Sequence, residues 1–218
     1  MAGQDRGQQR VPWRLPSPLH PAIAADAKLV ITLLKQHIPI DKDTRLLEVG
    51  CGWGLFTFHL DHECNVLGID TSREMLQRNP IDRTLLMDVQ DLQFDGGTFD
   101  VVFAHDMLHH VPDLDKAVRE MVRVSKRYVV IVEPNILNPA NAIIGIAMEE
   151  ERKAHRFTLR RLGQLVIRNG LRPIHRRTYG IAIPFLTPRM LVPVQRALSF
   201  DQPFGLEHLV IAERVLTD

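Results

Sequence analysis

Short apolar runs alternate with stretches of helical periodicity along most of this chain. Runs rich in Val, Leu and Ile occupy residues 45–50, 65–70, 83–88, 99–106 and 128–134, and segments with helical spacing lie between them. Strands that are apolar throughout, rather than alternating with polar residues, are typical of a parallel sheet whose two faces are covered by helices. The pattern therefore predicts an α/β fold.

The two ends of the chain follow different patterns. Residues 1–20 are polar and then proline-rich, which predicts a flexible N-terminal arm before a single domain at 21–218. Residues 21–39 have helical spacing, and a second helix is expected at 159–170. The strand candidates at 171–180 and 207–215 lack a full crossover helix between them, so we expect an antiparallel pair at one edge of the sheet.

Composition and charge limit the kind of protein that this chain can be. The 218 residues are 45% hydrophobic, which suffices for one sizeable core, and the formal charge of +1 gives no strong field toward nucleic acid or membrane. Two cysteines form no disulfide framework, the first residues lack an apolar signal region, and the apolar runs are too short to span a bilayer. We expect a soluble, cytoplasmic protein with no nucleic-acid partner and no integral membrane segment. The oligomeric state is left open.

The stretch LLEVGCGWG, residues 46–54, places three glycines directly behind an apolar strand. A glycine-rich turn between a strand and a helix has no side chains in the way, so a ligand can approach the backbone closely. The free N–H groups at the start of the helix point toward that ligand. A second strand ends at Asp70, where a carboxylate can accept hydrogen bonds from both hydroxyls of a ribose. The predicted ligand contains adenosine.

The acidic residue within this stretch separates two kinds of adenosine ligand. A dinucleotide site uses the spacing G-x-G-x-x-G and holds a pyrophosphate, whereas Gly50, Gly52 and Gly54 are spaced G-x-G-x-G and follow Glu48. A carboxylate beside the turn repels a pyrophosphate but attracts an ammonium or a sulfonium group. The charge favours S-adenosylmethionine over NAD.

Four segments in order then carry a specific resemblance. They are LLEVGCGWG, VLGIDTSREML, MDVQDLQFDGGTFDVVFAHDMLHHV and LDKAVREMVRVSKRYVVIVEPN, within residues 44–135. Together they resemble the class I S-adenosylmethionine-dependent methyltransferases, with most likeness to the small-molecule branch that includes ubiquinone- and menaquinone-type enzymes. The resemblance implies a Rossmann-like sheet of seven mostly parallel strands in the order 3-2-1-4-5-7-6, with strand 7 antiparallel and helices on both faces.

The same resemblance implies a set of cofactor-binding residues. Glu48 and the backbone of Gly50, Cys51 and Gly52 would hold the methionine portion, and Asp70 would bind the ribose. Thr71 and Met75 would flank the ribose site, Asp88 and the backbone of Val89 would bind the adenine, the carbonyl of His105 would meet the methionine ammonium, and His110 would form a wall of the site.

Two residues are candidates for a general base. His109 and Glu133 both follow strands whose carboxyl ends border the expected cleft, and either could take a proton from the methyl acceptor. A third possibility is that no base is needed, because the methyl group is already activated on a positively charged sulfur and alignment supplies the rate. The segment HDMLHHV contains three histidines, but without a neighbouring cluster of cysteines or carboxylates we expect no metal.

The acceptor depends on segments outside these motifs. Residues 138–157 and 181–200 are apolar and long, which suggests lids over a pocket, although they could equally pack on the sheet. A basic run between Arg152 and Arg177 could bind phosphate or form a solvated face. We expect a small, partly apolar or lipid-like acceptor. The competing interpretations are a non-catalytic cofactor-binding protein, an RNA or protein methyltransferase and, least favoured, an NAD oxidoreductase.

Overall fold

The computed structural model describes residues 17–147, 157–180 and 187–215, and its centre is a seven-stranded sheet in the order β3-β2-β1-β4-β5-β7-β6. The strands are β1 (Arg45–Val49), β2 (Asn65–Asp70), β3 (Thr84–Leu86), β4 (Phe99–His105), β5 (Ser125–Pro134), β6 (Leu171–Tyr179) and β7 (Glu207–Arg214). Only β7 runs antiparallel to its neighbours, β5 and β6. The predicted strand order and the antiparallel edge pair are confirmed.

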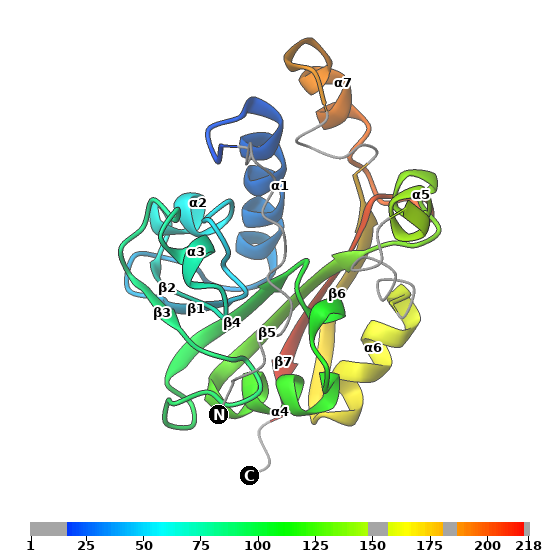
Figure 1. The fold of residues 1–218 in the computed structure, drawn as a ribbon. Helices are drawn as coiled ribbons and strands as arrows, with labels where there is room; N and C mark the ends of the chain where they lie inside the picture. The colour runs from blue at the N-terminus through cyan, green and yellow to red at the C-terminus, as the bar shows by residue number, and fades with distance from the viewer. Residues whose placement is uncertain (1–16, 148–156, 181–186, 216–218) are drawn as a thin grey trace, which may run out of the picture.

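Helices cover both faces of this sheet (Figure 1). They are α1 (Pro21–His37), α2 (Thr57–Asp61), α3 (Arg73–Leu76), α4 (Leu114–Val124), α5 (Pro139–Ala147), α6 (Leu159–Arg168) and α7 (Val192–Ala197), with 3-10 turns η1 (Leu108–His110) and η4 (Arg189–Leu191). The first three lie on one side of the sheet, and α4 and α6 lie on the other. The architecture is the α/β class that the apolar runs predict.

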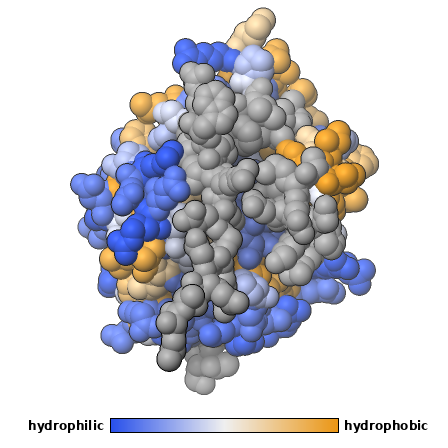
Figure 2. All heavy atoms as spheres, in the orientation of Figure 1, coloured by the Kyte–Doolittle hydropathy of each residue, from blue (hydrophilic) through white to orange (hydrophobic). Residues whose placement is uncertain are grey.

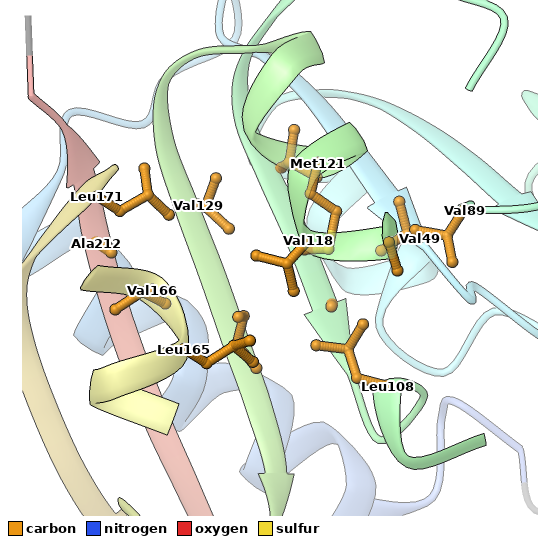
Figure 3. Close-up of a cluster of buried hydrophobic side chains, with 14 of the residues drawn as sticks. Val49, Val89, Leu108, Val118, Met121, Val129, Leu165, Val166, Leu171 and Ala212 are labelled. Atoms are coloured by element: carbon orange, nitrogen blue, oxygen red, sulfur yellow. The ribbon is translucent and has the colours of Figure 1, made fainter. Parts of the chain in front are cut away.

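Alternate residues of each strand supply two separate cores. In β1, Leu47 and Val49 pack with α4 and α6, as Figure 3 shows for Val49, Val118 and Leu165. Leu46 points the other way and packs against α1 and α2. Because successive side chains of a strand alternate between faces, a strand buried on both faces must be apolar throughout. This parity also decides on which side each functional side chain lies.

Two strand boundaries differ from the sequence expectation. β3 has three residues rather than six, and its Leu85 and Leu86 are exposed because this strand forms the edge of the sheet. β5 begins three residues earlier than predicted, since α4 ends at Val124 and the strand follows at Ser125 with no intervening turn. Neither change moves the carboxyl ends of the central strands.

The start of α1 is fixed by residues that the sequence assigned to the flexible arm. The His20 side chain accepts a hydrogen bond from the Ala22 N–H and caps the helix, with proline in the first turn. His59 in α2 lies 2.9 Å from the Pro18 carbonyl oxygen through its Nε2. The remainder of the expected arm, residues 1–16, lies outside the described residues.

No helix in the described part of the chain is long and apolar enough to cross a bilayer.

Candidate functional site

The glycine turn joins β1 to α2 at the carboxyl edge of the sheet. Gly50, Gly52 and Gly54 all have positive φ, at 72°, 49° and 87°. A Cβ atom on Gly50 would lie 2.6 Å from the Cβ of Met107, and one on Gly54 would lie 2.4 Å from Oδ1 of Asn79. Gly52 has no atom within 4 Å of that position. Two glycines are therefore needed for packing, and Gly52 leaves open space where a ligand can approach.

Cys51 lies inside this turn but is a packing residue. Its side chain is buried against β2, where Gly68 makes room for it, because a Cβ on Gly68 would lie 2.7 Å from the sulfur. Burial raises the pKa of the Cys51 thiol, so the reactive thiolate is disfavoured. What Cys51 offers a ligand is its backbone.

Glu48 is buried in the central strand β1, with 3% of its surface exposed. Burial raises the pKa of its carboxyl to about 7, although a hydrogen bond with the Thr57 hydroxyl acts in the opposite direction. Its Oε2 has no hydrogen-bond partner among the described residues. A buried acceptor without a donor is costly, and this one adjoins the open turn.

Asp70, at the end of β2, connects that strand to the glycine turn through hydrogen bonds of its carboxylate. Its Oδ2 accepts a hydrogen bond from the Gly52 N–H at 2.9 Å, and its Oδ1 accepts one from the Ser72 N–H at 2.8 Å. Ser72, rather than Asp70, caps α3 by accepting from the Met75 N–H. Each carboxylate oxygen keeps a further lone pair for a ligand. Thr71 is exposed beside it, and Met75 is buried.

Asp88 and Val89 follow β3 and lie in a tight turn. The Asp88 carboxylate accepts a hydrogen bond from the Gln90 N–H at 2.8 Å and also contacts the Gln90 side chain. The side chain of Val89 points into the core beside Val49 (Figure 3). Val89 can therefore serve a ligand only through its backbone.

His105 ends β4 on the α1 face of the sheet. Its ring lies 4.0 Å from the ring of Phe56, which follows the glycine turn. Its Nε2 is 3.3 Å from Oε2 of Glu207, and its Nδ1 is 3.7 Å from Oδ2 of Asp106. Burial lowers the pKa of this imidazole, but the two carboxylates outweigh burial and raise it to about 10. Asp106 has φ at 48°, the one positive φ among described non-glycine residues.

The two candidate bases form one buried pair. Nδ1 of His109 lies 2.7 Å from Oε2 of Glu133, and Oε1 of Glu133 accepts hydrogen bonds from the N–H groups of Met107 and Leu108. Both side chains are almost fully buried. By strand parity Glu133 lies with Ile131 on the α4 face, opposite to His105. The ring of His110 lies 3.9 Å from that of His109, with the two planes tilted by 49°.

Sequence reasoning missed three residues beside His105. Asp26 from α1, Glu207 from β7 and His105 each offer one ligand atom, and these atoms lie within 4.8 Å of one another. The Tyr179 hydroxyl donates to Oε2 of Glu207 at 2.5 Å. Burial raises the pKa of the Asp26 carboxyl well above its usual range, whereas His105 holds that of Glu207 low against the effect of burial. No cluster of carboxylates lies near the histidines in the sequence. In the folded chain, however, Asp26 and Glu207 lie beside His105.

Comparison with known proteins gives the class. Residues 47–132 match the family model described as a methyltransferase domain. Phosphatidylethanolamine N-methyltransferase of Cereibacter sphaeroides is 39% identical over 93 residues, which cover 38% of this chain and 46% of that protein. The 27-O-demethylrifamycin SV methyltransferase of Amycolatopsis mediterranei is 32% identical over 100 residues, covering 40% and 36%. The chain thus spans less than half the length of these curated relatives.

Solved structures share the fold over most of the chain. A methyltransferase of Thermotoga maritima, described as a possible histamine N-methyltransferase, superposes with a TM-score of 0.68 at 16% identity and covers 88% of this chain and 89% of its own. One from Archaeoglobus fulgidus gives 0.64 at 17% identity, covering 86% and 94%. At such identities the likeness concerns the fold alone.

Residues 47–132 therefore match a methyltransferase domain, and the strand order of the sheet is the one expected for the class I S-adenosylmethionine-dependent methyltransferases. The matches do not single out the ubiquinone- and menaquinone-type branch. The residues present fit the cofactor, because Gly52 leaves a cradle open and the buried Glu48 keeps one oxygen for a donor such as an ammonium.

Proposed function

We propose that the protein transfers the methyl group of S-adenosylmethionine to a small, partly apolar or lipid-like acceptor. The observation that carries this proposal is the open cradle at Gly52, bordered by the carboxylate of Asp70 and adjoined by that of Glu48. The bound cofactor supplies a methyl group on a positively charged sulfur. The protein then has to align the acceptor and exclude water, which is enough for a good nucleophile.

The cofactor-binding roles are part of the same proposal. Glu48 would accept from the methionine ammonium, the Gly50–Gly52 backbone would border the methionine chain, and Asp70 would accept from the ribose hydroxyls. The residues assigned to the remaining contacts are Thr71, Met75, Asp88, Val89, His105 and His110. His109 and Glu133 are proposed to hold the loop after β4 in place, since both Glu133 oxygens already accept hydrogen bonds.

The surface around α5 and α7 supports an apolar acceptor. Ile143 and Ile146 of α5 are 67% and 78% exposed, and Val194 of α7 is 48% exposed. Figure 2 shows hydrophobic residues at the top and right of the molecule, where Figure 1 places α7 and α5. The names of the similar proteins also include small and amphiphilic acceptors, from phosphatidylethanolamine to sarcosine.

The basic run gives less support for phosphate binding. Arg168 pairs with Asp115 and Arg172 with Glu213, while Arg177 donates to the Ser199 carbonyl. These side chains are engaged separately along α6 and β6. Two free, buried cysteines, Cys51 and Cys64, suit our proposal of a reducing, cytoplasmic location.

A matched pair of glycine variants tests the cofactor site. Gly52→Ala and Gly170→Ala both place a side chain at positive φ, 49° and 79°, with no atom within 4 Å. Both should lose a similar free energy of unfolding, about 1 kcal/mol. Only Gly52→Ala should weaken binding of S-adenosylhomocysteine, by at least tenfold in calorimetry, because its methyl group enters the cradle.

Equal binding by wild type and Gly52→Ala would overturn the placement of the cofactor at this turn. Binding of S-adenosylhomocysteine without methyl transfer to any amphiphilic acceptor would favour the non-catalytic alternative.

A further inference from the structure

A cavity of about 260 Å³ lies between α1 and α7. Its lining includes Asp26, Lys28 and Leu29 of α1 and Gln195 and Arg196 of α7. Val192 of α7 packs on α1 at Ala22 and Ala25, which holds the two helices together. The cavity therefore has walls from two elements that the chain separates by most of its length.

Asp26 is the unusual member of this lining. It is 8% exposed, and the interactions of its carboxyl within the described part of the chain are electrostatic ones with Glu207, His105 and Asp106 rather than hydrogen bonds. One of its oxygens lies within 4.8 Å of both a His105 nitrogen and a Glu207 oxygen. A buried carboxylate without a donor is costly unless a ligand supplies one.

The charges around Asp26 indicate what kind of ligand this is. The single positive charge of His105 already faces two carboxylates, Glu207 at 3.3 Å and Asp106 at 3.7 Å. His105 therefore leaves no positive charge to offset Asp26, whose carboxyl burial keeps protonated in the absence of a ligand, and a monovalent cation bound beside Asp26 would favour its ionised form. A divalent metal would need a free His105 lone pair and a free Glu207, but Glu207 also accepts from Tyr179 at 2.5 Å. An organic ammonium group fits these conditions better than a metal ion.

The cavity is lined by one further buried acceptor and by two cations. Oε1 of Gln195 is buried and has no hydrogen-bond partner among the described residues, so the cavity holds a second acceptor that lacks a donor. Lys28 and Arg196 line the same cavity and are exposed. Acceptors lie at the buried side and cations at the exposed side, which matches a ligand with an amino group next to an anionic group.

The buried side of the cavity also adjoins the cofactor turn. The His105 ring, next to Asp26, packs at 4.0 Å on Phe56, and Phe56 directly follows the turn at residues 50–54. A ligand amino group at Asp26 would thus lie on the side of the site where the cofactor binds.

We propose that this cavity binds the methyl acceptor, and that the acceptor carries a protonated amino group held by Asp26 beside a phosphate-like anion held by Lys28 and Arg196. The inference rests on the proposed methyltransferase function and names its substrate class. Asp26 would take one proton from the ammonium, and the freed nitrogen lone pair would form the new N–C bond as the methyl–sulfur bond breaks. The products are a methylammonium and S-adenosylhomocysteine, with the proton passing from Asp26 to water. Burial, which raises the pKa of the Asp26 carboxyl, makes it a better proton acceptor.

Calorimetry on the full chain saturated with S-adenosylhomocysteine tests this assignment. The probes are O-phosphoethanolamine, lysophosphatidylethanolamine, ethanolamine and glycerol 3-phosphate. Asp26→Asn should weaken binding of all three amines at least tenfold, with Asp43→Asn, an exposed carboxylate, as its control. Lys28→Gln together with Arg196→Gln should weaken the phosphate probes but not ethanolamine, with the exposed Lys116→Gln as control. Tighter binding of the lysolipid than of O-phosphoethanolamine identifies a lipid head group; equal binding identifies a free phosphoamine.

Several results would overturn the inference. If S-adenosylhomocysteine binds but neither phosphoamine does, the inference fails and the proposed function stands; if S-adenosylhomocysteine does not bind, the proposed function fails first. Binding of MnCl₂ that requires Asp26, His105 and Glu207 would replace the amine site with a metal site. If Asp26→Asn does not fold, the double variant of Lys28 and Arg196 still decides, because its unchanged affinity for O-phosphoethanolamine would contradict the cavity as its site.

Discussion

Glu48 combines two properties that a structural residue rarely has. It is buried in the central strand, and one of its carboxylate oxygens lacks a donor among the described residues. With its pKa raised to about 7 by burial, it is partly protonated at neutral pH in the absence of ligand. A cofactor ammonium would favour the ionised form, so cofactor binding should release a proton from this residue.

This coupling predicts a pH-dependent affinity. Between pH 6 and pH 8 the ionised fraction of Glu48 rises from about a tenth to about nine tenths, so affinity for S-adenosylhomocysteine should rise by up to about tenfold. Calorimetry at the two pH values measures it. Glu48→Gln should bind weakly and without this pH dependence, whereas the exposed Glu74→Gln should behave as wild type. A wild-type affinity that is flat across this range would contradict the role of Glu48.

Residues inside the glycine motif could be predicted, and residues outside it could not. Glu48 and Asp70 lie within or directly after strands that the sequence marks, so their place at the carboxyl edge follows from the fold class. Asp26 lies in α1, whose sequence shows helical spacing but no functional motif. Glu207 is the first residue of the last strand, β7. Their meeting with His105 depends on how α1 packs across the sheet, and no local pattern encodes that contact.

At the scale of elements, the alternation of apolar runs predicts the sheet well because each central strand is buried on both faces. β3 was predicted too long, since its apolar residues at the sheet edge are exposed and sequence alone does not distinguish edge from centre. Strand parity was the more important omission. It places His105 on the α1 face and Glu133 on the α4 face, so the pairing of Glu133 with His109 could have been expected from parity once the strands were aligned.

The pair His109–Glu133 connects β5 to the loop after β4, and its loss should show as instability. Glu133→Gln removes the charge that three donors share, which should lower the free energy of unfolding by about 1–3 kcal/mol. Turnover should fall less than tenfold. Urea unfolding and steady-state rates measure both, with the exposed Glu74→Gln as a control that changes stability by less than about 0.5 kcal/mol.

The outcome separates positioning from base catalysis. A loss of turnover of about 100-fold in His109→Ala, with its stability intact, would instead show that His109 acts as the general base.

At the scale of the whole molecule, charge is concentrated under α1. Asp26, Glu48, His105 and Glu207 are all on that face, and all except Glu207, whose pKa His105 lowers, bind their protons more tightly in the folded than in the unfolded chain. Burial raises the pKa of Glu48 from 4.5 to about 7, and its carboxylate neighbours raise that of His105 from 6.5 to about 10. His208 differs, because burial lowers its pKa to about 4.

These shifts predict that the protein without ligand loses stability as the pH rises from 6.5 to 8.5. The stability from His105 is complete below about pH 6.5 and is lost toward pH 10, and that from Glu48 is lost as the pH passes about 7. His208 contributes above pH 6.5 and is constant over this window. The free energy of unfolding should fall by about 2–3 kcal/mol, measured by urea unfolding at the two pH values. His105→Gln should remove most of this slope. A wild-type stability that rises with pH would mean that the groups under α1 do not hold their protons more tightly in the folded chain, which would contradict the raised pKa values of Glu48, His105 and Asp26.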